Sequence, residues 1–174
     1  MSITLAALMT TCAPLVHPTT LRALIHVESA GNPYAVSVNR PQALNEEGID
    51  PPEFDPPRDL REALQLTRTL AGQGFTTSVG LAQINIEHLQ GLKLRLADLF
   101  NPCINLAVAQ RILIGCDSAQ PQAATPNPRL RLRRTLSCYN AGNFTTGLTN
   151  HYVITVTRAA LHRARSPKTL RSSA

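Results

Sequence analysis

One glutamate has a position in the sequence that suits a general acid. Leu21, Leu24, Ile25 and Glu28 fall at i, i+3, i+4 and i+7 of a predicted helix, so the carboxylate continues an apolar stripe instead of facing water. Glu28 also lies in the last turn, where the negative end of the helix dipole disfavours an ionised carboxylate. Desolvation and the dipole both raise the pKa of such a carboxyl group, which lets it hold a proton near neutral pH. An ion pair between Glu28 and an arginine fits the pattern equally well.

Two further segments combine glycine with side chains that suit neutral sugars. Gly80 to Asn85 contains the amide of Gln83, and Tyr139 to Asn143 contains the amide of Asn140. Each segment has a structural explanation of its own. The first is explained by the start of a helix, the second by a helix that ends with a glycine cap, and Tyr139 by a place in the core. Their combination with a core-facing glutamate favours a functional site.

Metal and triad chemistry are not indicated. No two of the four cysteines have the CxxC spacing of a zinc or redox site, and the histidines lack metal-ligand spacing and a serine or cysteine partner. We therefore expect no metal and no cofactor. The histidines are interpreted as structural or surface residues: His17, His26, His88, His151 and His162.

The cysteines bear on the cellular compartment. If residues 101–115 form one helix, Cys103 and Cys116 lie about 20 Å apart along its axis, which exceeds the roughly 7 Å between Cα atoms that a disulfide spans. A bridge from Cys12 to Cys103 or Cys116 is favoured and would indicate an oxidising compartment. Four buried free thiols in a cytosolic protein are the alternative. Cys138 is assigned no disulfide partner, because it lies next to the motif at Tyr139.

Composition predicts one globular domain. The chain has 174 residues, 43% hydrophobic, and a net charge of +6 with only 16% charged residues, which disfavours a disordered polycation. No apolar run approaches the roughly 18 residues that cross a bilayer, so no transmembrane segment is predicted. The basic run from Arg129 to Arg134 is interpreted first as a solvated helix face, with anionic wall polymers or nucleic acid as alternatives. Aromatic residues make up only 4% of the chain and are absent from that run, so no nucleic-acid partner is expected.

Helical periodicity dominates the chain and predicts a mainly α fold. Met1 to Thr11 is predicted to be a first helix and not a secretion signal, because the first cation is Arg22 and a signal peptide needs a basic n-region. Small strands are possible at 36–38 and 76–79, although 75–79 also fits a loop. Further helices are predicted from Pro18 to the stop at 30–33 and at 58–70, 101–115, 130–139 and 151–164. The proline-rich acidic segment 39–57 and residues 120–128 and 140–150 are predicted loops, and the tail 166–174 is predicted to be disordered.

The three segments together resemble the signature motifs of family 1 lytic transglycosylases. Glu28 to Pro33, Gly80 to Asn85 and Tyr139 to Asn143 match those motifs in order and spacing, and the resemblance spans roughly Leu15 to Val156. Residues 101–106 and 151–153 resemble the VirB1-like subfamily associated with type IV secretion. The sequence departs from the family pattern at Ala82, where methionine is usual, and at Cys138, where alanine is usual.

The resemblance implies a lysozyme-like (goose-type, or SLT) mainly α single domain over residues 1–165. It implies cleavage of the β-1,4 bond between N-acetylmuramic acid and N-acetylglucosamine in peptidoglycan, with a 1,6-anhydromuramoyl product. It also implies a periplasmic enzyme that opens the wall for a type IV secretion or conjugation apparatus, with peptidoglycan strands and secretion components as partners. The export route is not evident from the sequence. By the same resemblance Glu28 is the acid/base, Tyr139 orients it, Gly80 and Gly142 permit close backbone approach, and four residues face the sugars: Ser37, Gln83, Asn85 and Asn140.

The residues fit this chemistry without the resemblance. A retaining hydrolase with an enzyme nucleophile needs a second carboxylate about 5–5.5 Å from the acid, and the three motifs contain no second Asp or Glu. The N-acetyl oxygen of the substrate can attack the anomeric carbon instead, after which Glu28 deprotonates the C6 hydroxyl. The alternatives are a hydrolytic lysozyme that uses the same glutamate, a non-enzymatic wall-binding secretion scaffold, and a basic nucleic-acid-binding module.

Overall fold

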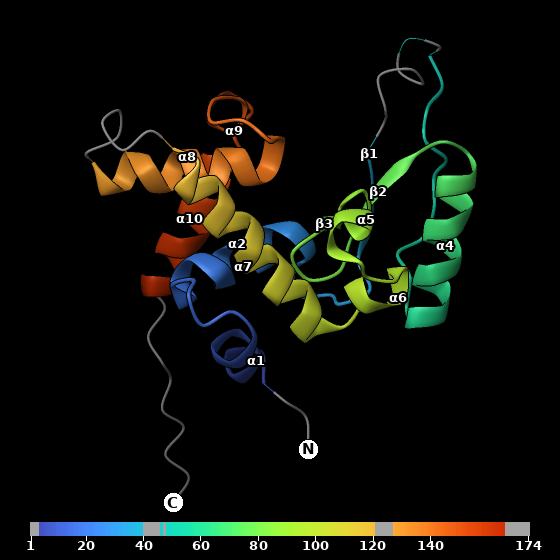
Figure 1. The fold of residues 1–174 in the computed structure, drawn as a ribbon, viewed down its shortest axis with the longest axis horizontal. Coiled ribbons are helices and arrows are strands. Elements are labelled where there is room, and N and C mark those ends of the chain that lie inside the picture. Colours follow the sequence, from blue (N-terminus) through green and yellow to red (C-terminus); the bar gives the residue numbers. More distant parts are fainter. Residues whose placement is uncertain (1–3, 40–45, 47, 121–126, 166–174) are drawn as a thin grey trace, which may run out of the picture. The chain divides into compact units, whose positions relative to one another are not determined.

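The computed structural model describes residues 4–39, 46, 48–120 and 127–165. The chain divides into two compact units, one with residues 4–15 and 28–111, and the other with residues 16–27 and those from 112 onward. Helices make up most of the described residues (Figure 1), which confirms the predicted mainly α class. The predicted disordered tail at 166–174, and residues 40–45 and 47 of the proline-rich acidic segment 39–57, lie outside the described residues. None of the helices within these ranges is long and apolar enough to span a bilayer.

The first unit contains a small antiparallel sheet with strand order β1-β2-β3. Its strands are β1 (Val36–Asn39), β2 (Thr76–Val79) and β3 (Ile84–Asn85). The strands predicted at 36–38 and 76–79 are confirmed, residues 76–79 are not a loop, and the third strand was not predicted. Helix α4 (Leu60–Gly72) contacts β1 and β2, and its N-cap is Asp59. Three short helices complete the unit: α1 (Leu5–Cys12), α5 (His88–Leu92) and α6 (Leu96–Leu99).

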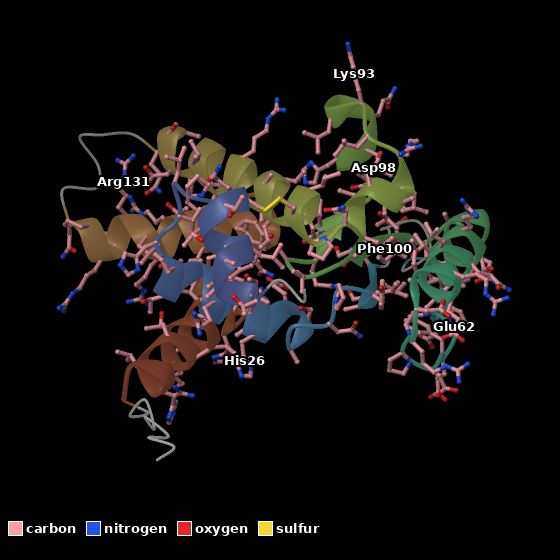
Figure 2. All side chains as sticks on the ribbon, turned by 90° about the horizontal axis from the view of Figure 1, so that it is seen from below. His26, Glu62, Lys93, Asp98, Phe100 and Arg131 are labelled. Carbon is pink, nitrogen blue, oxygen red and sulfur yellow. A yellow bond between two sulfur atoms is a disulfide. The ribbon has the colours of Figure 1, made fainter. Side chains whose placement is uncertain are left out.

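Strand register gives the sheet one apolar and one polar face. Val36, Val79 and Ile84 lie opposite one another, and the last two are at most 1% exposed. Ser37, Ser78 and Asn85 form the next row, and residues directly opposite in an antiparallel pair point to the same face. The core side of this unit also contains Phe100, which is 3% exposed, whereas Lys93 extends into solvent (Figure 2).

Two longer helices contribute residues to both units. Helix α2 (Pro18–Ser29) begins and ends as predicted, and it stops where Ala30 and Gly31 take φ of 52° and 88°. Helix α7 (Pro102–Ser118) begins at the predicted cap, where Asn101 Oδ1 accepts hydrogen bonds from the backbone N–H groups of Cys103 and Ile104.

The second unit is a helical cluster of α8 (Pro128–Ala141), α9 (Thr146–Thr149) and α10 (Tyr152–Arg165), which contact one another. Helix α9 was not predicted, because four residues are too few to show helical periodicity. Its Gly147 packs against Ser137 of α8 so closely that an added Cβ would lie 2.6 Å from Ser137 Cα. The close packing of α8 and α9 therefore depends on glycine at position 147, where any side chain would collide with Ser137.

Both pairs of cysteines form disulfides. Cys12 bonds to Cys103, with the Cα atoms 5.1 Å apart, and Cys116 bonds to Cys138, with the Cα atoms 5.8 Å apart. The predicted bridge from Cys12 is confirmed, with Cys103 as its partner, and the alternative of four free thiols is wrong. The second bridge was not predicted, because Cys138 had no assigned partner. Cys103 and Cys116 lie on the same helix, α7, and do not bond to each other.

Candidate active site

Glu28 lies in the last turn of α2, where the buried stripe of that helix ends. Leu21, Leu24 and Ile25 are at most 1% exposed, whereas Glu28 is half-buried. The next residue ties this end of the helix to the Gly80 segment, because Ser29 Oγ donates a hydrogen bond of 2.8 Å to the backbone oxygen of Leu81. Ser29 Oγ also accepts from the backbone N–H of Gly31 at 3.2 Å. Two of the three sequence motifs therefore meet next to Glu28.

The turn at residues 80–83 is held against the segment that precedes β1. The backbone oxygen of Ala35 accepts from the N–H of Gly80 at 2.9 Å and from Gln83 Nε2 at 3.2 Å. Gln83 Nε2 also donates to the backbone oxygen of Gly80 at 3.0 Å, so both of its amide hydrogens are engaged. Gln83 was predicted to face a sugar, and the oxygen Oε1 is the part of its amide that can still do so.

The side chain of Asn105 holds this turn in place through hydrogen bonds to its backbone. Asn105 was not among the predicted site residues. Its side chain is fully buried, and its Nδ2 donates to the backbone oxygens of Val79 and Leu99 at 2.9 and 2.8 Å. Its Oδ1 accepts from the N–H of Ala82 at 2.8 Å. A Cβ at Gly80, where φ is +79°, would lie 2.8 Å from the backbone oxygen of Leu99 and would also collide with the Asn105 amide. The sequence signal that could have identified Asn105 is a polar residue on an apolar helix face, which is also the signal that identified Glu28.

Two predicted sugar-facing residues lie in one row on the polar face of the sheet. Ser37 is exposed and lies opposite Ser78 of β2, and Ser78 lies opposite Asn85 of β3. Asn85 Oδ1 accepts from Thr76 Oγ1 and from the N–H of Glu87, both at 2.9 Å. The register thus gives this unit a surface of hydroxyl and amide groups beside the Gly80 turn.

Tyr139 and Asn140 lie in the last turn of α8, in the second unit. Tyr139 is half-buried and Asn140 is exposed, and Asn140 Oδ1 accepts from Asn150 Nδ2 at 2.9 Å. Helix α8 ends at Gly142, which has φ of 68° and caps the helix with its N–H on the oxygen of Cys138. No described protein atom lies within 4 Å of a Cβ added there, so φ alone requires glycine at this position. The glycine-cap explanation for this segment is confirmed.

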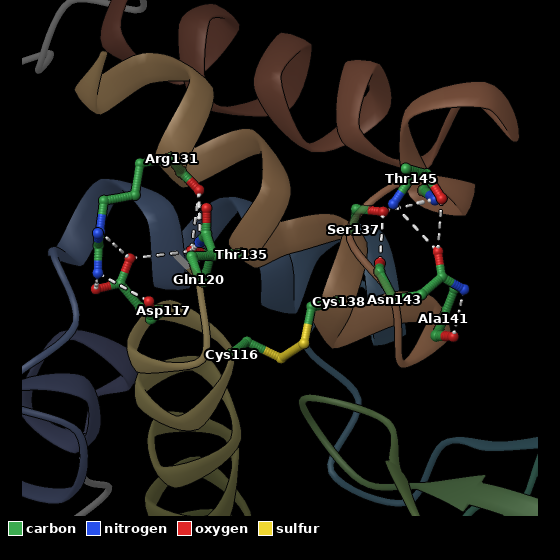
Figure 3. The surroundings of a disulfide bond; sticks show 11 residues. Cys116, Asp117, Gln120, Arg131, Thr135, Ser137, Cys138, Ala141, Asn143 and Thr145 are labelled. Carbon is green, nitrogen blue, oxygen red and sulfur yellow. Dashed lines mark hydrogen bonds and ion pairs between the residues drawn. A yellow bond between two sulfur atoms is a disulfide. The ribbon is translucent and has the colours of Figure 1, made fainter. Parts of the chain in front are cut away.

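Several contacts hold the chain on both sides of Tyr139 (Figure 3). Ser137 Oγ is buried, donates to the backbone oxygen of Asn143 at 2.9 Å and accepts from the N–H of Gly147 at 2.8 Å. Cys138, directly before Tyr139, is bonded to Cys116 at the end of α7. This disulfide explains the departure at position 138, since a cysteine there supplies the partner of Cys116.

A bidentate ion pair lies beside the same disulfide (Figure 3). Arg131 Nε and Nη2 donate to the two carboxylate oxygens of Asp117 at 2.8 Å each, and Thr135 Oγ1 donates to Asp117 Oδ1 at 3.2 Å. The hydrogen bonds from Arg131 lower the pKa of Asp117, with a smaller contribution from Thr135, while burial acts in the opposite direction. The basic run is therefore not uniform, because Arg131 is paired whereas Arg129 and Arg133 are exposed.

The candidate site residues divide between the two units. Glu28, Ser37, Gln83 and Asn85 belong to the first unit, and Tyr139 and Asn140 belong to the second. Two surface grooves run along α4 and its preceding loop, and the residues that line them include none of these six.

The chain has relatives among known proteins. A family model described as the transglycosylase SLT domain matches residues 6–156. The chain is 35% identical over 136 residues to the type IV secretion system protein virB1 of Brucella abortus, which covers 78% of the chain and 53% of that relative. It is 35% identical over 150 residues to protein virB1 of Agrobacterium fabrum, which covers 86% of the chain and 56% of that relative. The chain thus spans about half the length of these curated relatives, and no match was found among solved structures.

Proposed function

The chain belongs to the transglycosylase SLT domain family, and from this premise we propose that it is a lytic transglycosylase that cleaves the glycan strands of peptidoglycan. The observation that carries the proposal is the place of Glu28. This half-buried carboxylate ends a buried helical stripe and is joined through Ser29 to the sugar-compatible segment at residues 80–85. We assign residues 1–165 to one mainly α, lysozyme-like SLT domain, which contains both features.

In the proposed reaction Glu28 acts first as an acid and then as a base. Its proton passes to the glycosidic oxygen as the bond to the anomeric carbon of N-acetylmuramic acid breaks, and the N-acetyl oxygen attacks that carbon. The Glu28 carboxylate then takes the proton of the C6 hydroxyl. The C6 oxygen bonds to the anomeric carbon, the N-acetyl oxygen leaves it, and a 1,6-anhydromuramoyl end results. Glu28 returns to its protonated form, so one carboxylate serves the whole cycle.

Neutral polar groups complete the proposed site. The hydroxyl of Ser37, the amide oxygen of Gln83 and the amide of Asn85 offer hydrogen bonds to sugar hydroxyl and N-acetyl groups without a charge that would need a counterion. By the family resemblance, we assign Tyr139 to orient Glu28 through its phenol, and Asn140 to contact the glycan. No cofactor or metal enters this reaction scheme.

The relatives named as type IV secretion proteins supply the proposed setting. We propose that the enzyme works in the periplasm, where it opens the wall for a secretion or conjugation apparatus whose components are its partners. The two disulfides support this assignment, because such bonds persist in oxidising compartments.

Digestion of purified sacculi tests the proposal. The wild-type protein is expected to release muropeptides with anhydro ends, and Glu28→Gln is expected to release almost none, because the amide has the same shape and cannot transfer the proton. Glu53→Gln, at an exposed glutamate, is the matched control and keeps full activity. Mass spectrometry separates the outcomes. Products heavier by one water molecule indicate a lysozyme, turnover by a folded Glu28→Gln variant excludes Glu28 as the acid, and glycan binding without cleavage indicates a scaffold.

Tyr139→Phe tests the role assigned to the phenol. We expect a fall in kcat towards the lower end of the roughly 10²–10⁴-fold range of general acid–base effects, because Glu28 remains in place. KM is expected to change little. Full activity with an unchanged pH–rate profile would show that the hydroxyl has no part in the reaction.

A further inference from the structure

Two amides of the proposed site have their oxygen atoms engaged within the protein. Asn140 Oδ1 accepts from Asn150 Nδ2 at 2.9 Å, and Asn85 Oδ1 accepts from Thr76 Oγ1 and from the N–H of Glu87. Among the described residues, the Nδ2 group of neither asparagine has an acceptor. Each amide therefore presents a hydrogen-bond donor and not an acceptor.

The direction of these amides follows from backbone groups, which can only donate. The N–H of Tyr152 donates to the side chain of Asn150 at 3.1 Å, so the atom that receives it must be Oδ1. The other end of the Asn150 amide, which faces Asn140, is then the donor Nδ2. Since a donor faces it, the Asn140 atom at this contact must be Oδ1, and its Nδ2 is left to point elsewhere.

The same reasoning fixes Asn85 without a second side chain. The N–H of Glu87 meets the Asn85 oxygen directly, and the Thr76 hydroxyl can adapt to either end of an amide. Asn140 differs, because its orientation depends on the side chain of Asn150. That dependence makes the donor at Asn140 open to a test by a single substitution.

We infer that Asn150 is a positioning residue, which fixes the Asn140 amide with Nδ2 presented to the glycan. The group that this donor recognises is an acceptor oxygen of the substrate, and we assign it to the carbonyl oxygen of an N-acetyl group. The inference rests on the proposed function for its ligand, whereas the orientation of the amide rests only on the contacts within the protein.

The test is Asn150→Asp, which reverses one hydrogen bond and keeps the other. The carboxylate still accepts from the Tyr152 N–H, and a negative charge suits the first turn of α10. It cannot donate to Asn140, so the Asn140 amide must turn, give its Nδ2 to Asp and present Oδ1. Asn127→Asp is the matched control in the same unit, since Asn127 Oδ1 accepts from the N–H of Arg129 at the start of α8.

Two measurements decide the outcome. Side-chain amide resonances and NOE contacts of Asn140 in the free protein are expected to change in Asn150→Asp and not in Asn127→Asp. Titration with an N-acetylglucosamine tetramer is expected to show binding about 10-fold weaker for Asn150→Asp, as for the loss of one hydrogen bond, with an unchanged Tm. In an Asn140→Ala background Asn150→Asp is expected to have no further effect on this affinity.

Equal affinity of wild type and Asn150→Asp, or an effect that persists in Asn140→Ala, would overturn the positioning role. An Asn140 amide that does not turn in the free Asn150→Asp protein would overturn the fixed orientation. If the wild-type protein binds no tetramer but the Asn140 amide does turn in Asn150→Asp, the assigned ligand and the proposed function are contradicted. The orientation of the amide is then still confirmed.

Discussion

The two units hold their parts of the candidate site by different means. In the first unit the Gly80 turn rests on the fully buried amide of Asn105, all of whose hydrogen bonds go to backbone groups. In the second unit the segment around Tyr139 is held by the buried hydroxyl of Ser137, by exposed hydrogen bonds and by the Cys116–Cys138 disulfide. The buried amide of Asn105 can position the Gly80 turn only because the surrounding atoms are closely packed. The disulfide can position the end of α8 although the residues there are only half-buried or exposed.

The disulfides give the largest expected contrast. In the chain-entropy model, the bridge over 91 residues from Cys12 to Cys103 contributes about 4.5 kcal/mol and the bridge over 22 residues from Cys116 to Cys138 about 3.5 kcal/mol. Replacing both cysteines of each pair by alanine is therefore expected to lower the free energy of unfolding more for Cys12 and Cys103. The opposite order is expected for kcat: the Cys116→Ala/Cys138→Ala protein should lose more activity, because Cys138 adjoins Tyr139.

Urea unfolding and sacculus digestion measure the two effects on the same proteins. The Cys12→Ala/Cys103→Ala protein serves as the control for activity, since it loses more stability without touching the α8 segment. If activity follows stability in both variants, the disulfide at Cys138 has no positioning role.

Two glycines with similar backbone angles give the next contrast. Gly80 and Gly142 have φ of +79° and +68°, but only Gly80 has protein atoms where a Cβ would lie. Gly142→Ala is expected to cost about 1 kcal/mol for a left-handed residue, and Gly80→Ala about 3 kcal/mol because overpacking adds to that strain. Urea unfolding of both variants gives the difference. Equal losses would mean that the Asn105 contact adapts easily and that the first unit is held no more tightly than the second.

Local patterns in the sequence were enough for the long helices and for the place of Glu28 in the last turn of α2. The apolar spacing at Leu21, Leu24 and Ile25 and the start signals at Pro18 and Asn101 lie within one helix turn, so the starts of α2 and α7 were predicted to within a residue. The short elements β3 and α9 have two and four residues, too few for any periodicity to appear.

The contacts that shape the candidate site are long-range and could not be predicted in the same way. Asn105 meets the backbone of Val79 and Ala82, which lie 26 and 23 residues away. Nothing in the spacing of Cys138 pointed to Cys116. The common row of Ser37 and Asn85 depends on the register of three strands, which a pattern of a few residues does not specify. Sequence motifs therefore supplied the candidate residues, and tertiary pairing decides which of their polar atoms are still available to a ligand.

The smallest expected effect concerns the ion pair that accompanies the second disulfide. Hydrogen bonds from Arg131 depress the pKa of Asp117 in the folded protein below its ordinary value, so the stabilisation is present above the unfolded pKa and is lost as the pH falls through the folded pKa. Asp117→Asn is therefore expected to lower the free energy of unfolding slightly at neutral pH, and the difference from wild type should vanish as the pH falls through the folded pKa of Asp117. The effect is small because the two side chains are 30% and 44% exposed and water screens their charges. Urea unfolding across this pH range measures it, with Asp55→Asn in the exposed loop as the control. A difference that stays constant with pH would mean that the neutral hydrogen bonds, and not the charge of Asp117, join the end of α7 to α8.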